Sequence, residues 1–189
     1  MENWEELEQA CHSCRRCGLC EGRNHVVFGV GNREADILFV GEGPGQQEDL
    51  LGEPFVGPAG KLLDEMLCII DLDRKKNCYI ANIVKCRPPN NRDPEEGEQE
   101  ACIGYLRRQV ALVRPKVIVC LGRIAAKRII DPEFRITRQH GQWVEKNGIW
   151  MMATYHPSAL LRDLGKRPEA FEDLLSLREK LREVGARME

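Results

Sequence analysis

Four short runs of continuous apolar residues divide the chain, and each has the length of a buried β-strand. Each run is bounded by polar, glycine or proline residues, which end a strand in a turn. An uninterrupted apolar run indicates a strand that is covered on both faces, as in a parallel sheet. The runs lie within residues 36–42, 78–84, 116–122 and 149–155.

The segments between these runs carry apolar residues at helical spacing, as Leu63, Leu67 and Ile70 do after the first run. The same spacing predicts helices within residues 93–113, 125–130 and 171–184, the first of them with Asp93 as its N-cap before Pro94. Residues 131–148 predict a loop with a weak hairpin. Strands that alternate with helices predict βαβ units, and hence an α/β protein: a three-layer α/β/α sandwich around a central four-stranded, mainly parallel sheet.

Three distinctive loops follow predicted strands, at the sheet edge where open α/β proteins bind ligands: residues 41–49, 85–92 and 156–161. The first has three glycines in five residues, so that its backbone amides can approach a ligand closely. It is not a dinucleotide fingerprint, because Gln46 stands where the third glycine is needed. A phosphate loop is also excluded, because Leu62 replaces the required Ser or Thr. The acids of this loop favour a neutral polar ligand.

Asn82 interrupts the apolar run 78–84. A buried amide must be hydrogen-bonded, either to the protein or to a ligand. Two interpretations therefore stay open: Asn82 caps a loop, or it reads the edge of a ligand.

The overall composition is that of a globular protein, with 189 residues, 42% hydrophobic and 31% charged. This length suits one domain, residues 1–189. The net charge of -2 excludes a polycation, so contacts to nucleic acid would need local basic patches. The acidic amino end argues against a signal peptide, and no 18-residue apolar stretch could span a membrane. We therefore expect a cytoplasmic protein that does not enter membranes.

The nine cysteines change this picture, because an odd number without signs of secretion favours metal or cluster ligation over disulfides. Cys11, Cys14, Cys17 and Cys20 are spaced three apart in the segment 1–24. The spacing approaches a ferredoxin-type run but does not determine which of the four bind.

The remaining cysteines divide into two groups. Cys86, on the basic loop, and Cys102, on the inner face of the following helix, form a second candidate thiolate pair. Cys68, Cys78 and Cys120 lie in apolar elements and are expected to be inert core residues.

Four motifs together identify a resemblance. They are Gly41-Glu42-Gly43-Pro44-Gly45 with Glu48-Asp49, Pro54-Phe55-Val56-Gly57, Asn82 with Lys85-Cys86-Arg87-Pro88-Pro89, and His156-Pro157-Ser158. In this order and at these separations they closely resemble the family 4 uracil-DNA glycosylases, over essentially the whole chain. The resemblance implies an α/β/α iron–sulfur enzyme of base excision repair that removes uracil from DNA and leaves an abasic site.

The resemblance also implies a [4Fe-4S] cluster, held by residues at the positions of Cys14, Cys17, Cys86 and Cys102. The pairs Cys11/Cys14 and Cys17/Cys20 remain alternatives for the amino-terminal ligands. Such a cluster would have a structural role, pinning the segment 1–24 onto the domain.

Excision requires that the base leave the stack and enter a pocket. Phe55 is the aromatic residue on a predicted site loop and would stack on the base. Asn82 would pair with uracil N3 and O4, helped by the backbone amide of Gly43. His156 would donate a hydrogen bond to uracil O2, where negative charge develops.

Other roles are assigned by position in the same loops. The residues expected to position water are Glu42, Glu48 and Asn91. Leu160 and Leu161 are expected wedges into the base stack. The expected phosphate contacts are Lys85, Arg87, Arg92 and Arg162.

The expected partner is uracil-containing DNA, single- or double-stranded, bound by a monomer. One alternative is a family 5-type glycosylase with a broader range of bases. Another is a non-catalytic iron–sulfur module that binds DNA, against which the joint presence of Phe55, Asn82 and His156 argues.

Overall fold

The computed structural model describes residues 3–189, so the first two residues of the segment 1–24 lie outside the described part. Over the described residues the chain forms a six-stranded sheet with the strand order β1-β3-β2-β4-β6-β5. The strands are β1 (Val30–Gly31), β2 (Ile37–Gly41), β3 (Tyr79–Asn82), β4 (Val117–Leu121), β5 (Val144–Lys146) and β6 (Ile149–Thr154).

The four predicted strands correspond to β2, β3, β4 and β6, which pair in parallel. The α/β class is therefore confirmed. The predicted number of strands is wrong, because β1 and β5 add one antiparallel strand at each edge of the sheet. These edge strands have two and three residues and are not fully buried, so neither produces a continuous apolar run in the sequence.

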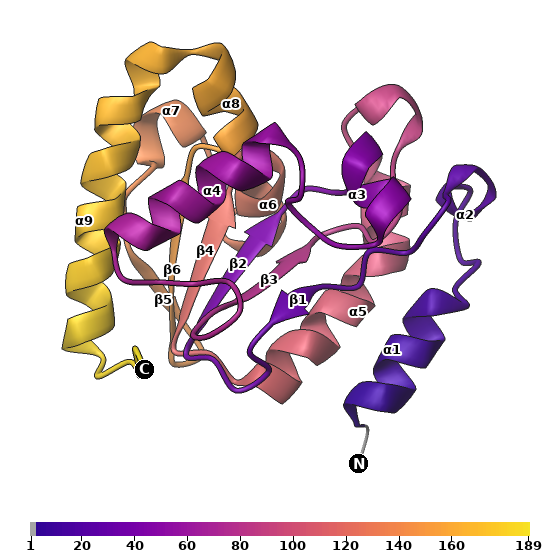
Figure 1. Ribbon diagram of the computed structural model, residues 1–189, viewed down its shortest axis with the longest axis horizontal. Coiled ribbons are helices and arrows are strands. Elements are labelled where there is room, and N and C mark those ends of the chain that lie inside the picture. The colour runs from indigo at the N-terminus through magenta and orange to yellow at the C-terminus, as the bar shows by residue number, and fades with distance from the viewer. Residues whose placement is uncertain (1–2) are drawn as a thin grey trace.

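Helices cover both faces of the sheet (Figure 1). They are α1 (Trp4–His12), α2 (Leu19–Gly22), α3 (Gln46–Leu51), α4 (Pro58–Ile69), α5 (Glu96–Val113), α6 (Arg123–Ile129), α7 (Ile136–Gln139), α8 (Pro157–Arg162) and α9 (Arg167–Glu183), with the 3-10 turns η1 (Pro89–Asn91) and η2 (Leu164–Lys166). Within residues 3–189, none of these helices combines the length and the apolar character that crossing a membrane requires.

Two hydrophobic cores separate the three layers. Along β2, Ile37 and Phe39 face the core shared with α4 and α9, whereas Leu38 and Val40 face the core shared with α1 and α5. This alternation follows from the two-residue period of a strand, and because both faces are covered, all five positions of β2 are buried.

The order of the parallel strands fixes where a ligand can bind. The chain passes from β2 to β3 on one side, then returns across β2 to β4 and β6 on the other. The carboxyl ends of these strands meet at one edge, and the reversal of direction opens a crevice there. In this way the fold brings the three predicted loops to the same edge.

Two local predictions are wrong. Helix α5 begins at Glu96 with Glu95, not Asp93, as its N-cap, because the Glu98 carboxylate accepts the backbone N–H of Glu95 at 2.8 Å and closes a capping box. Cys68 is exposed, because it lies on the outer side of α4, whereas Cys78 and Cys120 are buried as expected.

Candidate active site

Two adjoining cavities open at the carboxyl edge of the sheet, with volumes of about 510 Å³ and about 220 Å³. Residues after β2, β3, β4 and β6 supply their walls. Gly43, Asn91 and His156 line both cavities, so the two share a common wall. Phe55 and Asn82 line only the smaller one. The side chains predicted to recognise a base therefore come together in one place.

Phe55, the predicted stacking residue, is buried, with only 5% of its surface accessible. Its ring stacks on the ring of His156 with 5.4 Å between centroids and 30° between planes. Gly41 allows this position, because a Cβ there would lie 2.7 Å from Phe55 Cζ and 2.5 Å from Asn82 Oδ1. The Phe55 ring and the Asn82 amide can therefore lie this close to the end of β2 only because residue 41 is glycine.

Asn82 ends β3 and is 2% exposed. Its Oδ1 is buried and has no hydrogen-bond partner among the described residues. An unsatisfied buried acceptor costs about 1–3 kcal/mol, so native proteins rarely retain one without a use. Because Asn82 lines the smaller cavity, a donor on a ligand there would satisfy this oxygen.

His156 precedes α8 and acts as its N-cap. Its Nδ1 accepts the backbone N–H of Ser158 at 3.0 Å, and the Ser158 hydroxyl lies 2.7 Å from the same nitrogen. Burial, and secondarily the charge of Arg162, lower the pKa of His156 to about 4. The ring is therefore neutral near pH 7, and because Nδ1 is an acceptor, its proton is on Nε2. His156 presents a fixed neutral donor.

Glu42 lines the larger cavity beside Asp93 and Arg123. Burial, and then the Asp93 carboxylate, raise the pKa of Glu42 to about 7 against the opposing charges of Arg123 and Arg162. Asp93 in turn forms an ion pair with Arg123. A carboxyl group that titrates near neutrality is suited to handling a proton or orienting water.

Asp93 and Arg123 were not predicted from the sequence as site residues. Arg123 lies two residues after the end of β4, the third parallel strand, so the strand-end rule could have found it. Gly122 before it has φ +95°, and a Cβ at this position would lie 3.0 Å from His156 Cβ. The turn after β4 therefore makes room for His156.

Glu48 was expected to position water, but its carboxylate is engaged by the backbone. One oxygen accepts the N–H of Gly45 at 3.0 Å, and the other accepts those of Val56 and Gly57, each at 3.1 Å. These bonds tie the glycine loop to the Phe55 segment. Asn91 is exposed, accepts Arg87 Nε at 2.7 Å and lines both cavities.

Two residues expected to contact DNA are buried, which corrects those predictions. Lys85 is 1% exposed, and its ammonium donates to the Asn82 carbonyl at 2.9 Å and to Gln109 Oε1 at 2.7 Å, so it cannot reach a phosphate. Leu160 is 2% exposed, because α8 turns it into the core. By contrast, Leu161 is 41% and Leu164 is 63% exposed. Leu161 in α8 and Leu164 in η2 are therefore the exposed leucines of this segment, with Leu164 in place of Leu160.

Of the other predicted cations, Arg92 and Arg162 line the larger cavity, whereas Arg87 does not line it and donates to Asn91 Oδ1 at 2.7 Å. Arg162 is exposed, and Arg92 forms an ion pair with Glu98 at 2.7 Å. Lys166 also lines this cavity but was not predicted from the sequence.

A third, small cavity lies between the amino-terminal segment and α5, and five cysteines line it. They are Cys11, Cys14, Cys17, Cys86 and Cys102. Cys20 is not among the lining residues. The fold therefore brings the amino-terminal cysteines next to Cys86 and Cys102, although the two groups are far apart in the chain.

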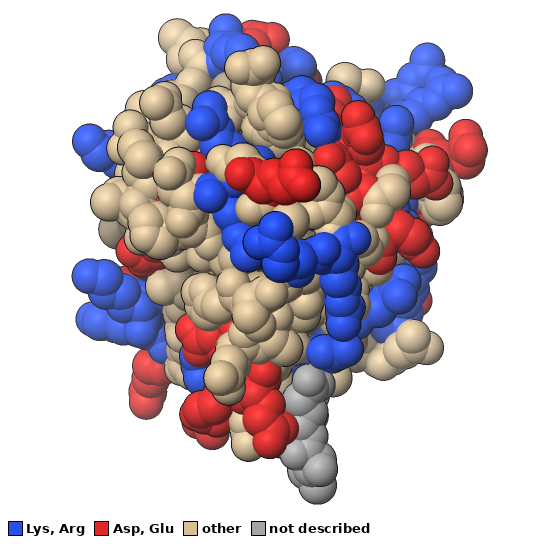
Figure 2. All heavy atoms as spheres, turned by 90° about the vertical axis from the view of Figure 1, so that its right-hand side faces the viewer, with Lys and Arg blue, Asp and Glu red and all other residues tan. Residues whose placement is uncertain are grey.

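On the face that carries α1 and α2, acidic and basic side chains alternate without forming one continuous basic area (Figure 2).

The chemistry of this donor set fits an iron–sulfur cluster. The backbone N–H of Lys85 donates to Cys102 Sγ at 3.3 Å and Arg23 donates to Cys86 Sγ at 3.6 Å, bonds that favour thiolates. No three His, Cys, Asp or Glu side chains among residues 3–189 converge on a position for a single metal ion. A four-iron cluster has a different requirement, because each cysteine binds its own iron at a separate corner.

Comparisons with known proteins point to one enzyme superfamily over most of the chain. A model of the uracil DNA glycosylase superfamily matches residues 28–177. A Type-4 uracil-DNA glycosylase of Archaeoglobus fulgidus is 47% identical over 97% of this chain and 94% of its own length. The Type-4 enzyme of Sulfurisphaera tokodaii is 44% identical over 95% of this chain and 85% of its own length. A Type-5 uracil-DNA glycosylase of Pyrobaculum aerophilum is 30% identical over 72% of this chain and 67% of its own length.

Proposed function

Because the chain belongs to the type-4 uracil-DNA glycosylases of the uracil DNA glycosylase superfamily, we propose that it flips uracil out of DNA and hydrolyses the N-glycosidic bond. The product is an abasic site, the first intermediate of base excision repair. The observation that carries the proposal is Asn82 Oδ1, which has no hydrogen-bond partner in the described part of the chain and is buried beside Phe55 and His156 in one cavity. A base with a donor on its edge is the ligand that this arrangement lacks.

Recognition of uracil follows from the chemistry of these groups. Asn82 Oδ1 accepts the N3–H of uracil while its amide nitrogen donates to O4. Cytosine has an acceptor at N3 and an amine at C4, so both contacts become unfavourable. The ring of Phe55 supplies a stacking surface for the extruded base, and the backbone of Gly43 lies within the same cavity wall.

Bond cleavage leaves negative charge on the departing uracil and positive charge on the sugar. His156 donates from Nε2 to uracil O2 as that charge develops, and it needs no proton transfer to do so. The bond from Ser158 holds the ring in the required tautomer before the substrate arrives. This preorganisation means that the donor is not reoriented during the reaction.

Water is positioned by Glu42 in this scheme. Its ionised carboxylate accepts a hydrogen bond from the water that attacks C1′. Asn91 lies on the wall common to both cavities and assists. Glu48 is left to hold the loops, because its oxygens already accept backbone N–H groups.

The DNA backbone lies along the larger cavity. Arg87, Arg92 and Arg162 contact phosphates, joined by Lys166. Leu161 and Leu164 fill the gap that the extruded nucleotide leaves in the stack, because both are exposed on the segment that follows His156 in the chain.

The cysteine cavity holds a [4Fe-4S] cluster on Cys14, Cys17, Cys86 and Cys102. When bound, the cluster supplies a structural cross-link between the amino-terminal segment and the loop that follows β3. Lys85 supports this assignment, because a buried ammonium with no carboxylate partner among the described residues balances the negative charge of thiolates. In the same proposal residues 1–189 form one domain. The monomeric state and the cytoplasmic location stay predictions.

Replacing any one of the four proposed ligands by Ser is expected to remove most of the iron and the brown visible absorbance. Three thiolates leave one corner of the cluster without a protein ligand, which exposes it to loss. Cys20→Ser is the matched control and should keep full absorbance, because Cys20 does not line the cavity. Iron content and the visible spectrum measure both. A Cys11→Ser variant that bleaches while Cys14→Ser does not would move the ligand role to Cys11.

The function itself is tested with an oligonucleotide that contains one uracil, followed by alkali. We expect strand breakage at uracil in single- and double-stranded substrates, and none at thymine or cytosine. Hypoxanthine and ethenocytosine substrates test the broader type-5 range, which the lower identity to the Type-5 relative disfavours. A cluster-loaded protein that leaves uracil intact would overturn the proposal.

A further inference from the structure

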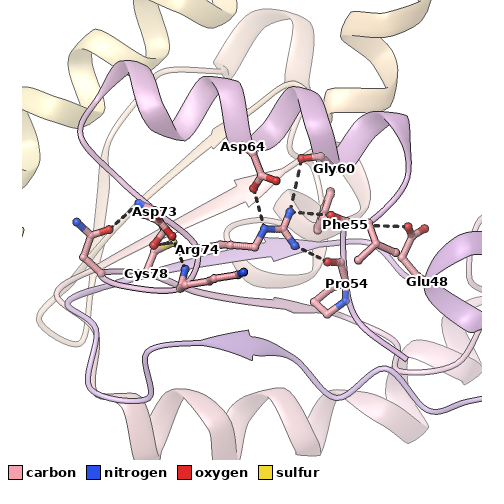
Figure 3. Close-up of polar contacts among 11 residues, drawn as sticks. Glu48, Pro54, Phe55, Gly60, Asp64, Asp73, Arg74 and Cys78 are labelled. Carbon is pink, nitrogen blue, oxygen red and sulfur yellow. Dashed lines mark hydrogen bonds and ion pairs between the residues drawn. The ribbon is translucent and has the colours of Figure 1, made fainter. Parts of the chain in front are cut away.

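The ring of Phe55 is held by an unusual backbone conformation. Phe55 has φ 52°, in the left-handed region that side chains of its size rarely adopt. Such a conformation persists only where surrounding contacts over-determine it. The contacts that do so come from two charged side chains on opposite sides of the loop (Figure 3).

Arg74 holds the carbonyl groups on one side of the loop. Its NH1 donates to the Pro54 carbonyl at 2.8 Å and its NH2 donates to the Phe55 carbonyl at 2.6 Å. Its Nε donates to Asp64 Oδ1 at 2.7 Å, which fixes the plane of the guanidinium. Gly60 completes the enclosure, because a Cβ there would lie 1.9 Å from the Phe55 carbonyl oxygen.

Glu48 holds the N–H groups that follow Phe55. A single carboxylate oxygen accepts the N–H of Val56 and of Gly57. The peptides on both sides of the ring are therefore bonded to charged groups. Phe55 has little freedom to leave the cavity.

Arg74 itself has no direct role in chemistry. It is 8% exposed and does not line either cavity of the active site. A buried guanidinium is costly unless every donor is used. Here its bonds go to the Phe55 segment, to Asp64 and, at 3.5 Å, to the Gly60 carbonyl.

We propose that Arg74 is a positioning residue for base recognition, which acts by fixing the ring of Phe55 where an extruded uracil stacks. The inference rests on the proposed function and deepens it. Because the ring is already ordered in the free protein, a base that enters the cavity does not have to order it. Arg74 thereby strengthens uracil binding without touching the base.

The test is a double-mutant cycle between Arg74→Met and Phe55→Ala, with kcat/KM for uracil excision as the readout. Phe55→Ala is expected to lower kcat/KM about 10- to 100-fold, the usual range for one stacking contact. Arg74→Met should cause a loss of similar size and weaken inhibition by free uracil by the same factor. In the Phe55→Ala background, Arg74→Met should add less than about 3-fold.

Arg187→Met is the matched control. Arg187 also binds a carboxylate and a carbonyl, those of Asp36 and Glu34, but it lies away from the active-site cavities. It should lower the thermal midpoint without changing kcat/KM or uracil inhibition. If Arg74→Met does not fold, Asp64→Asn is measured in its place. This substitution weakens the ion pair that orients the Arg74 guanidinium, and it does so at a half-exposed side chain.

The outcomes separate the two proposals. Losses that multiply in the double variant, or equal losses of kcat/KM in the Arg187 control, would overturn the positioning role. An unmutated protein that excises no uracil would instead overturn the proposed function.

Discussion

Replacing His156 by Ala is expected to lower kcat/KM for uracil excision about 10²- to 10³-fold, the usual effect of removing one preorganised donor to a developing negative charge. The donor is Nε2, because Nδ1 already accepts the N–H of Ser158. Single-turnover rates on a uracil-containing oligonucleotide measure the loss.

His156→Asn serves as the matched control for structure. His156 is also the N-cap of α8, and Asn is a strong N-cap that can accept the same N–H. The Asn variant should therefore keep the thermal midpoint that the Ala variant lowers, yet be nearly as inactive. Recovery of activity in the Asn variant would mean that His156 acts only through the helix.

The pH profile distinguishes His156 from Glu42. Burial lowers the pKa of His156 to about 4, so its ring stays neutral across the ordinary working range. Burial and Asp93 raise the pKa of Glu42 to about 7, so its ionised form is lost as the pH falls through about 7. We expect kcat/KM to fall below about pH 7, and this fall to persist in His156→Asn but to vanish in Glu42→Gln. If the fall in kcat/KM below about pH 7 disappeared in His156→Asn, the titrating group would be His156 and not Glu42.

Replacing Asn82 by Ala is expected to lower kcat/KM for uracil by about 10³-fold, because two edge contacts to the base are lost together. The free energy of unfolding of the Asn82→Ala variant should not fall along with its activity. The Oδ1 atom is buried and has no partner among residues 3–189, so its removal relieves a cost of about 1–3 kcal/mol that offsets the cavity left behind. Chemical denaturation and excision rates are measured on the same preparation.

Gln109→Ala is the matched buried amide for stability. Gln109 is fully buried, accepts from the Lys85 ammonium at 2.7 Å, and donates to the Phe28 carbonyl at 2.8 Å. Its removal should cost about 2–3 kcal/mol, because it leaves a buried charge with one partner fewer. Equal destabilisation by the Asn82 and Gln109 variants would show that Asn82 is an ordinary structural amide.

The comparison of Lys85 with Asn82 explains why some site residues were predictable and others were not. Asn82 interrupts an apolar run, and that local contrast is visible in the sequence. Lys85 lies in a basic loop like any surface lysine, and only the side chains around it show that it is buried. Leu160 and Leu161 differ in the same way, because the orientation of a six-residue helix decides which of them faces the core.

The four parallel strands, the loops at their carboxyl ends and the residue types proposed to read a pyrimidine were all predictable before the fold was known. These depend on local periodicity and composition, which survive in any arrangement of the elements. Packing alone reveals that Oδ1 of Asn82 has no partner within residues 3–189, that Asp93 faces Glu42 and that Arg74 holds Phe55 from 19 residues away. Such contacts join segments that are distant in the chain, so their distances and burial exist only once the layers have packed.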